Sequence, residues 1–195
     1  MRVTEIVRQR WVIRSLILAT AIFFVTLIAG TLTGRSIAEE LIAQFGGVLA
    51  PLASTGSLSI LLLLAVFINN AIKALVLIFL GILLGLPPVL FIAVNGFVLG
   101  GLGSALESAK GWGYVLASFA PHGVIEIPAI LLAAALGLSL GIESFKWLAR
   151  RESQVKLQLS NGLKVYVRWI LPGLAVAAII EAFVTPLVMG LVNAG

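Results

Sequence analysis

Long apolar stretches alternate with short polar segments along the chain. Five stretches are long enough to cross a bilayer: residues 12–31, 58–86, 89–106, 114–140 and 169–192. A transmembrane helix needs about 20 mostly apolar residues, whereas a transmembrane β-strand shows about ten residues of alternating polarity, and no such segments occur. The pattern therefore predicts an all-α fold, a polytopic transmembrane helical bundle of about five spans. We expect a single transmembrane domain over residues 1–195.

Two of the five stretches contain signals that interrupt a straight helix. A straight helix over residues 58–86 would be about 43 Å long, against a hydrocarbon core of about 30 Å, so it must tilt, protrude or break. We expect Leu86, Pro87 and Pro88 to end it, because proline opposes the continuation of a helix. Pro121 and Pro128 lie inside the fourth span. They predict that this span is either kinked or broken into half-helices.

The segments between the spans differ in charge. Residues 32–57 are mixed, and Leu41, Ile42, Phe45 and Val48 have helical spacing, so we expect a short interfacial helix there. With the N-terminus inside, the inner segments hold ten Lys and Arg residues, and the outer segments hold Arg35 and Lys110. This asymmetry predicts a multi-pass protein of the cell (plasma) membrane with a cytoplasmic N-terminus and an outside C-terminus. Residues 142–168 would then be a basic cytoplasmic segment, and residues 32–57 an outer one.

Composition narrows the class of protein further. The chain is 61% hydrophobic, with a mean hydropathy of +1.16, which excludes an ordinary soluble domain. The net charge of +5 is explained by the topology, so we expect the lipid bilayer, and no nucleic acid, as a partner. The absence of cysteine excludes disulfides, thiolate metal sites and cysteine nucleophiles.

Polar and ionisable residues lie near the middle of four spans. These residues are Asn69, Asn70, Lys73, Asn95, His122, Glu126 and Glu181. A lone charge at the centre of a bilayer costs about 2.5–3.5 kcal/mol on insertion scales, so exposing each of them separately to lipid would be unfavourable. We therefore expect one shared interior cluster, in which Lys73 pairs with Glu126 or Glu181.

The sequence leaves the role of this cluster open among an ion, proton or solute site, a structural network, and intramembrane metal- or proton-dependent chemistry. His122 and Glu126 are four residues apart, which suits two metal ligands on one helix face. A catalytic zinc site normally takes three protein ligands, so Glu181 or an asparagine would have to complete it. No HExxH, P-loop or dinucleotide-binding motif is present, and the chain has no aspartate for a standard Ser-His-Asp triad. We predict no catalytic residue and no cofactor.

Prolines and glycines are expected to shape and pack the helices. Pro121, Pro128 and Pro186 lie next to the polar residues of the last two spans and are predicted to bend them. Three glycine pairs have GxxxG spacing: Gly81 with Gly85, Gly96 with Gly100, and Gly137 with Gly141. Such pairs allow helices to approach closely. They predict packing within the bundle, or a homodimer through Gly-rich helix faces.

Several motifs in order resemble the stage II sporulation protein M family. They are an Asn-Asn segment at 69–70, an Asn-Gly pair at 95–96, Pro-His-Gly-x-x-Glu-x-Pro at 121–128, and Glu-Ala-Phe-x-Thr-Pro at 181–186. The resemblance implies an integral membrane protein. The family's namesake acts as a scaffold beside membrane-anchored peptidoglycan-degrading enzymes. The resemblance therefore implies that this chain is a non-enzymatic component of a cell-envelope complex and has partner proteins. The polar cluster supports the alternative of a small transporter or channel for an ion, proton or small solute.

Overall fold

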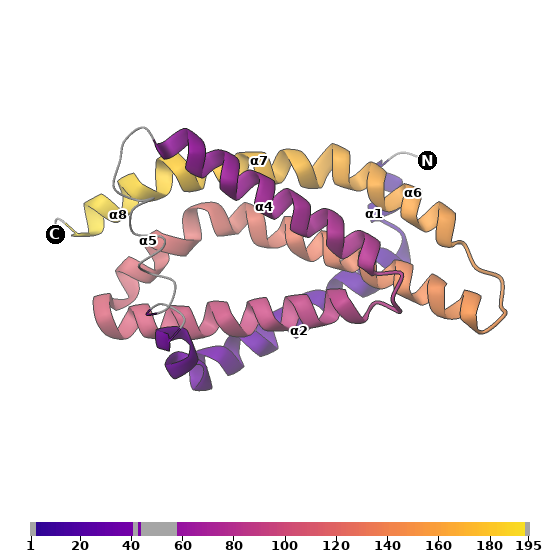
Figure 1. Cartoon of the computed structure of the whole chain (residues 1–195), viewed down its shortest axis with the longest axis horizontal. Helices are drawn as coiled ribbons and strands as arrows, with labels where there is room; N and C mark the ends of the chain where they lie inside the picture. The colour runs from indigo at the N-terminus through magenta and orange to yellow at the C-terminus, as the bar shows by residue number, and fades with distance from the viewer. Residues whose placement is uncertain (1–2, 41–42, 44–57, 194–195) are drawn as a thin grey trace.

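A computed structural model describes residues 3–40, 43 and 58–193, and all regular structure in that part of the chain is helical (Figure 1). The helices are α1 (Val3–Val7), α2 (Arg10–Thr33), α4 (Leu58–Leu80), α5 (Leu86–Leu148), α6 (Val155–Val165), η1 (Tyr166–Ile170), α7 (Leu171–Ile179), η2 (Ile180–Val184) and α8 (Thr185–Asn193). Most of the interfacial helix predicted within residues 32–57 lies outside the described residues. Residues 35–40 and Ala43 are helical.

Helix α5 is a hairpin that contains both the third and the fourth predicted spans. Its backbone leaves the helical conformation at Gly111, with φ 80° and ψ 166°, and the second arm returns along the first (Figure 1). A Cβ atom built on Gly137 would lie 2.9 Å from Pro88 Cγ, which shows how close the two arms are. Among the described residues, four helices are long and apolar enough to cross a membrane. Because one of them folds back, they match the predicted five spans only roughly.

The second span ends earlier than the sequence predicts. Helix α4 stops at Leu80, and residues 81–85 form a turn in which Leu84 and Gly85 have φ values of 57° and 74°. Pro87 and Pro88 begin α5 instead of ending α4. Proline fits the first turn of a helix, where its missing N–H group has no helical partner to lose. The long apolar stretch therefore breaks, which was one of the three expected outcomes.

The backbone stays helical through both prolines of the fourth span. Within α5, the non-helical residue is Gly111, which precedes this span. Figure 1 shows the second arm changing direction after the hairpin turn before it runs along the bundle. The fourth span is therefore a bent continuous helix, and it is not broken into half-helices.

Residues 155–193 form one helical segment that contains two π turns. The fifth span predicted at 169–192 belongs to this longer segment, and α6 occupies part of the predicted basic segment 142–168. Each π turn ends just before a proline: η1 precedes Pro172, and η2 precedes Pro186. Proline clashes with the carbonyl group four residues earlier in a regular helix, and a π turn adjusts the backbone at that point.

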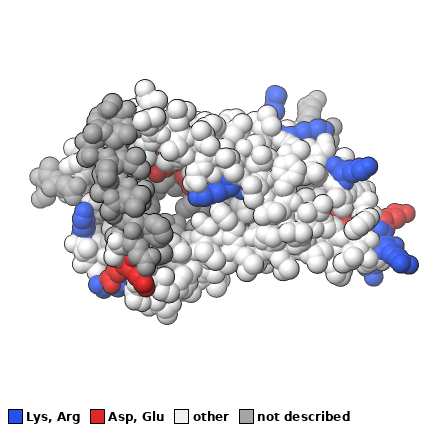
Figure 2. All heavy atoms as spheres, viewed as in Figure 1, with Lys and Arg blue, Asp and Glu red and all other residues white. Residues whose placement is uncertain are grey.

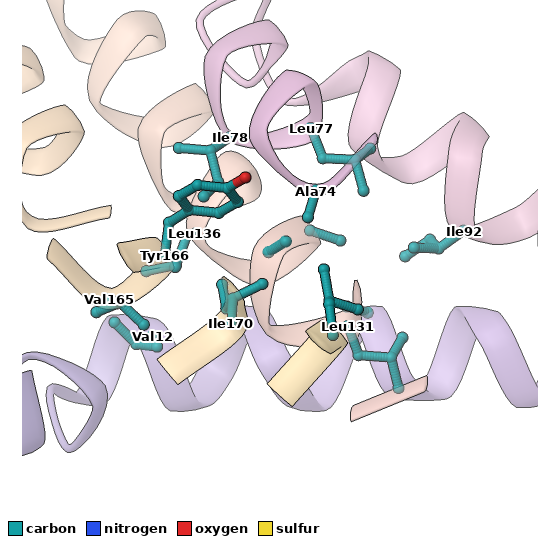
Figure 3. Packing of buried hydrophobic residues seen from close by; sticks show 14 of the residues in the cluster. Val12, Ala74, Leu77, Ile78, Ile92, Leu131, Leu136, Val165, Tyr166 and Ile170 are labelled. Carbon is teal, nitrogen blue, oxygen red and sulfur yellow. The ribbon is translucent and has the colours of Figure 1, made fainter. Parts of the chain in front are cut away.

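Close packing of the helices forms the hydrophobic core (Figure 3). Ala74, Leu77 and Ile78 of α4 pack against Leu136 of α5 and Ile170 of η1. Glycines permit this approach, since a Cβ atom on Gly137 would overlap the carbonyl oxygen of Leu77.

All three predicted GxxxG pairs have close neighbours within the chain. A Cβ atom on Gly96 or Gly100 would overlap the backbone of α2, and Gly81 and Gly85 face the second arm of α5 at Gly137 and Gly141. The pairs therefore serve packing within one chain. A homodimer through Gly-rich faces stays a prediction.

The surface of the bundle is apolar between two charged ends. Figure 2 shows Lys and Arg residues mostly at the end where α6 and the N-terminus lie, with a largely uncharged band in the middle. Exposed apolar side chains include Ile17, Leu32 and Leu187, which are 64%, 77% and 71% exposed. Such a surface is compatible with lipid rather than water. Which end faces the cytoplasm stays a prediction.

Candidate intramembrane site

His122, Glu126 and Glu181 meet inside the apolar part of the bundle. One nitrogen or oxygen atom from each side chain lies within 4.8 Å of those of the other two, and all three residues are half-buried. His122 and Glu126 are on the second arm of α5, where the four-residue spacing places them on one face. Glu181 lies in the π turn η2, before Pro186. Two helical segments distant in sequence thus supply the three groups.

Thr185 supports this triad from the first turn of α8. Its hydroxyl group lies 3.4 Å from Nδ1 of His122, and only 6% of the residue is exposed. The sequence does contain a signal for it, because Thr185 follows Glu181 by four residues and therefore shares its helix face. Thr185 was nevertheless not among the predicted site residues.

A cavity of about 160 Å³ adjoins the triad and connects it with α2, α4 and the first arm of α5. Its polar lining residues are Asn70, Lys73, Asn95 and Glu126. Lys73 is the only charged residue in α4. Glu126 belongs to both the cavity and the triad, so it joins the two groups of polar residues.

Lys73 does not form the close ion pair that the sequence predicts. Arg35 pairs with Glu39 and Lys146 pairs with Glu143, but no ion pair shorter than 4.0 Å joins Lys73 to Glu126 or Glu181. The cavity explains this difference, because Lys73 and Glu126 both line it.

The asparagines occupy three different environments. Asn70 is buried with 8% exposure and lines the cavity. Asn95 also lines the cavity, and its Nδ2 donates to the carbonyl oxygen of Phe91 at 2.8 Å. Asn69 is exposed, is not a lining residue, and donates from Nδ2 to Asn70 Oδ1 at 3.4 Å. The structure therefore places Asn69 beside the cavity.

A Gly-x-Ser-x-Gly pattern at residues 137–141 was overlooked in the sequence. In serine hydrolases this spacing holds a nucleophile on an exposed turn between a strand and a helix. Here Ser139 lies inside the helical second arm of α5 and is 2% exposed. Its hydroxyl group donates to Leu136 O at 2.6 Å and accepts from Gln158 Nε2 at 2.8 Å. Ser139 is thus a packing residue that links α5 to α6.

The donor set of the triad suits a metal ion in type and number. One imidazole and two carboxylates give three protein ligands, which is the number that metal sites with an open position use. The second arm of α5 presents two of them, and η2 presents the third. The same groups can also take up or release protons.

Together, the apolar helices and this cluster define a polytopic helical membrane protein with an intramembrane polar site. The family model described as Stage II sporulation protein M matches residues 17–186. The chain therefore belongs to this family, and the resemblance seen in its motifs is confirmed. The match spans all seven polar residues of the predicted cluster. Comparisons with curated proteins and with solved structures give no match.

Proposed function

We propose that this protein moves an ion, a proton or a small solute across the membrane through its intramembrane site, without catalysing a chemical reaction. The observation that carries the proposal is the meeting of His122, Glu126 and Glu181 beside a cavity in an apolar bundle. Ionisable residues inside a membrane are costly, and in membrane proteins they mark ion pathways and proton relays.

The position of Lys73 favours transport over a purely structural network. A network that only fixed helix packing would gain most from a direct pair between Lys73 and a carboxylate, because partial pairing leaves buried charges uncompensated. Lys73 and Glu126 instead line the same cavity without a close ion pair, and this cavity has room for a water molecule or a small solute.

Transport is tested with purified protein in proteoliposomes that carry a pH-sensitive or ion-sensitive dye. We expect Glu126→Gln and Glu181→Gln to abolish the flux while the proteins stay folded. Glu152→Gln is the matched control, because Glu152 is an exposed carboxylate beyond the end of α5. The proposal fails if the wild-type protein gives no flux of protons, monovalent cations or divalent cations, or if both cluster variants retain it.

Family membership favours a second candidate, a scaffold or component of a cell-envelope complex. The match covers residues 17–186, which is most of the chain. The basic residues of α6 and η1, Lys156, Lys164 and Arg168, would then form a cytoplasmic surface for a partner. Under this function, Lys156→Glu with Lys164→Glu removes co-purifying envelope proteins, whereas Glu126→Gln leaves them bound. Retention of all partners by the double variant contradicts this role for the basic surface.

A further inference from the structure

We propose that the intramembrane site binds a divalent first-row transition-metal cation through His122, Glu126 and Glu181. This inference rests on the proposed transport function and names the class of ion that the site would take. The three side chains come from two helical segments, the second arm of α5 and the π turn η2. Binding an ion would therefore tie these two segments together.

The geometry of the triad is close to that of a coordination shell. The three ligand atoms lie within 4.8 Å of one another. Around a tetrahedral ion with bonds of about 2.1 Å, ligand atoms are separated by about 3.4 Å. Rotations within the flexible glutamate side chains close this difference without movement of the helices. The site is therefore nearly assembled before an ion arrives.

The ligand types select a particular group of metals. One imidazole with two carboxylates suits Mn²⁺, Fe²⁺ and Zn²⁺. Mg²⁺ and Ca²⁺ prefer oxygen ligands alone, and the chain offers no cysteine to a soft ion such as Cu⁺. The triad therefore predicts a preference for Mn²⁺ and Zn²⁺ over Mg²⁺ and Ca²⁺.

The surroundings of the triad supply two further elements of a metal site. Thr185 lies against Nδ1 of His122, a contact that orients the ring and leaves Nε2 free to coordinate. The cavity reaches Glu126, so water in it can complete the coordination shell. Lys73 lines the same cavity, and its positive charge repels a bound cation. This repulsion weakens binding, which a transported ion needs in order to be released.

The single histidine of the chain makes the decisive measurement unambiguous. Untagged full-length protein in nanodiscs is loaded with Mn²⁺ and examined by pulsed electron paramagnetic resonance. We expect modulation from the nitrogen of one imidazole, which can come only from His122. Bound Mn²⁺ without imidazole modulation, or no bound Mn²⁺ at all, overturns the inference. This measurement needs no variant, so a failure of some variants to fold does not affect it.

Zn²⁺ titration of variants then tests the individual groups by isothermal calorimetry. Thr185→Val should weaken binding by about tenfold, because it removes a group that orients a ligand. Glu181→Gln removes a ligand itself, so it should weaken binding by more than the roughly 10- to 100-fold that losing an orienting group costs. Lys73→Gln should strengthen binding by at least about threefold, because it removes a repelling charge. Glu152→Gln should change nothing. Equal affinity in Glu181→Gln and Glu152→Gln refutes the assignment of the triad.

Binding and flux are scored separately, so the two proposals can fail independently. If Mn²⁺ binds with imidazole ligation but no ion flux is measured, the metal site is supported and the transport function is refuted. If a flux of protons or monovalent cations depends on Glu126 but neither Mn²⁺ nor Zn²⁺ binds, the transport function is supported and the metal site is refuted.

Discussion

Replacing Gly137 by alanine tests the contact between α4 and the second arm of α5. A Cβ atom at Gly137 would overlap the carbonyl oxygen of Leu77 and lie 2.9 Å from Pro88 Cγ. The overlap is with backbone, which cannot rotate away as a side chain can. Gly190 is the matched control, because it lies in helix α8 and a Cβ atom there meets nothing within 4 Å.

The expected effect follows from comparing the two substitutions. Alanine is favoured over glycine in a helix by about 1 kcal/mol, and this gain is shared by both variants and cancels between them. The remaining difference is the cost of overpacking, which is about 1–3 kcal/mol. For a chain of this size, 1 kcal/mol shifts the unfolding temperature by about 2–4 °C. Gly137→Ala should therefore unfold about 2–12 °C below Gly190→Ala.

The measurement is the apparent unfolding temperature of both variants in one detergent, followed by tryptophan fluorescence. Both scans must run at the same rate, because the unfolding of membrane proteins is often irreversible and then depends on scan rate. If Gly137→Ala unfolds at the same temperature as Gly190→Ala, or above it, α4 does not pack against the second arm of α5 through Gly137. Such a result would also contradict the position of Asn70 and Lys73 of α4 in the lining of the cavity.

Three further predictions follow from single features. Tyr166→Phe removes the hydrogen bond that Tyr166 Oη donates to Ala71 O at 3.0 Å, and should lower the free energy of unfolding by about 1 kcal/mol; an unchanged unfolding temperature would contradict it. Gly111→Ala should destabilise by about 1–3 kcal/mol in the same assay through backbone strain alone, because no neighbour lies within 4 Å; an unstrained variant would mean a different hairpin turn. The chain has no cysteine, so an impermeant maleimide should label Lys110→Cys on intact cells and Glu152→Cys only after permeabilisation, and the opposite pattern would invert the proposed topology.

The sequence predicts the helices well because lipid imposes a simple requirement on them. Every backbone polar group in a bilayer must be paired within the protein, so a long apolar run becomes a helix with few alternatives. The polar residues are also informative, because each is costly in lipid. His122, Glu126 and Glu181 could therefore be expected to meet, and the structure places them together.

The ends of the helices and the close contacts could not be predicted in the same way. Residues 81–85 are as apolar as the helix before them, so the turn after α4 leaves no signal in the hydropathy pattern. The π turns depend on how each proline is accommodated, which hydrophobicity does not record. The distance from Lys73 to the carboxylates depends on the cavity, and the cavity depends on side chains from several segments, including Phe23 and Phe91.

The π turn η2 makes one position in the chain tolerant of a change in length. A π turn holds one more residue than a turn of α-helix, so a single deletion within Ile180–Val184 can be absorbed by reverting to regular helix. A deletion in the middle of α4 cannot be absorbed in this way, because α4 is a regular α-helix. It rotates one end of the helix by about 100° relative to the other. Relatives that lack one residue at η2 would therefore keep the bundle, but their counterpart of Glu181 would turn away from His122. A one-residue deletion at this point would therefore preserve the fold and remove the intramembrane site.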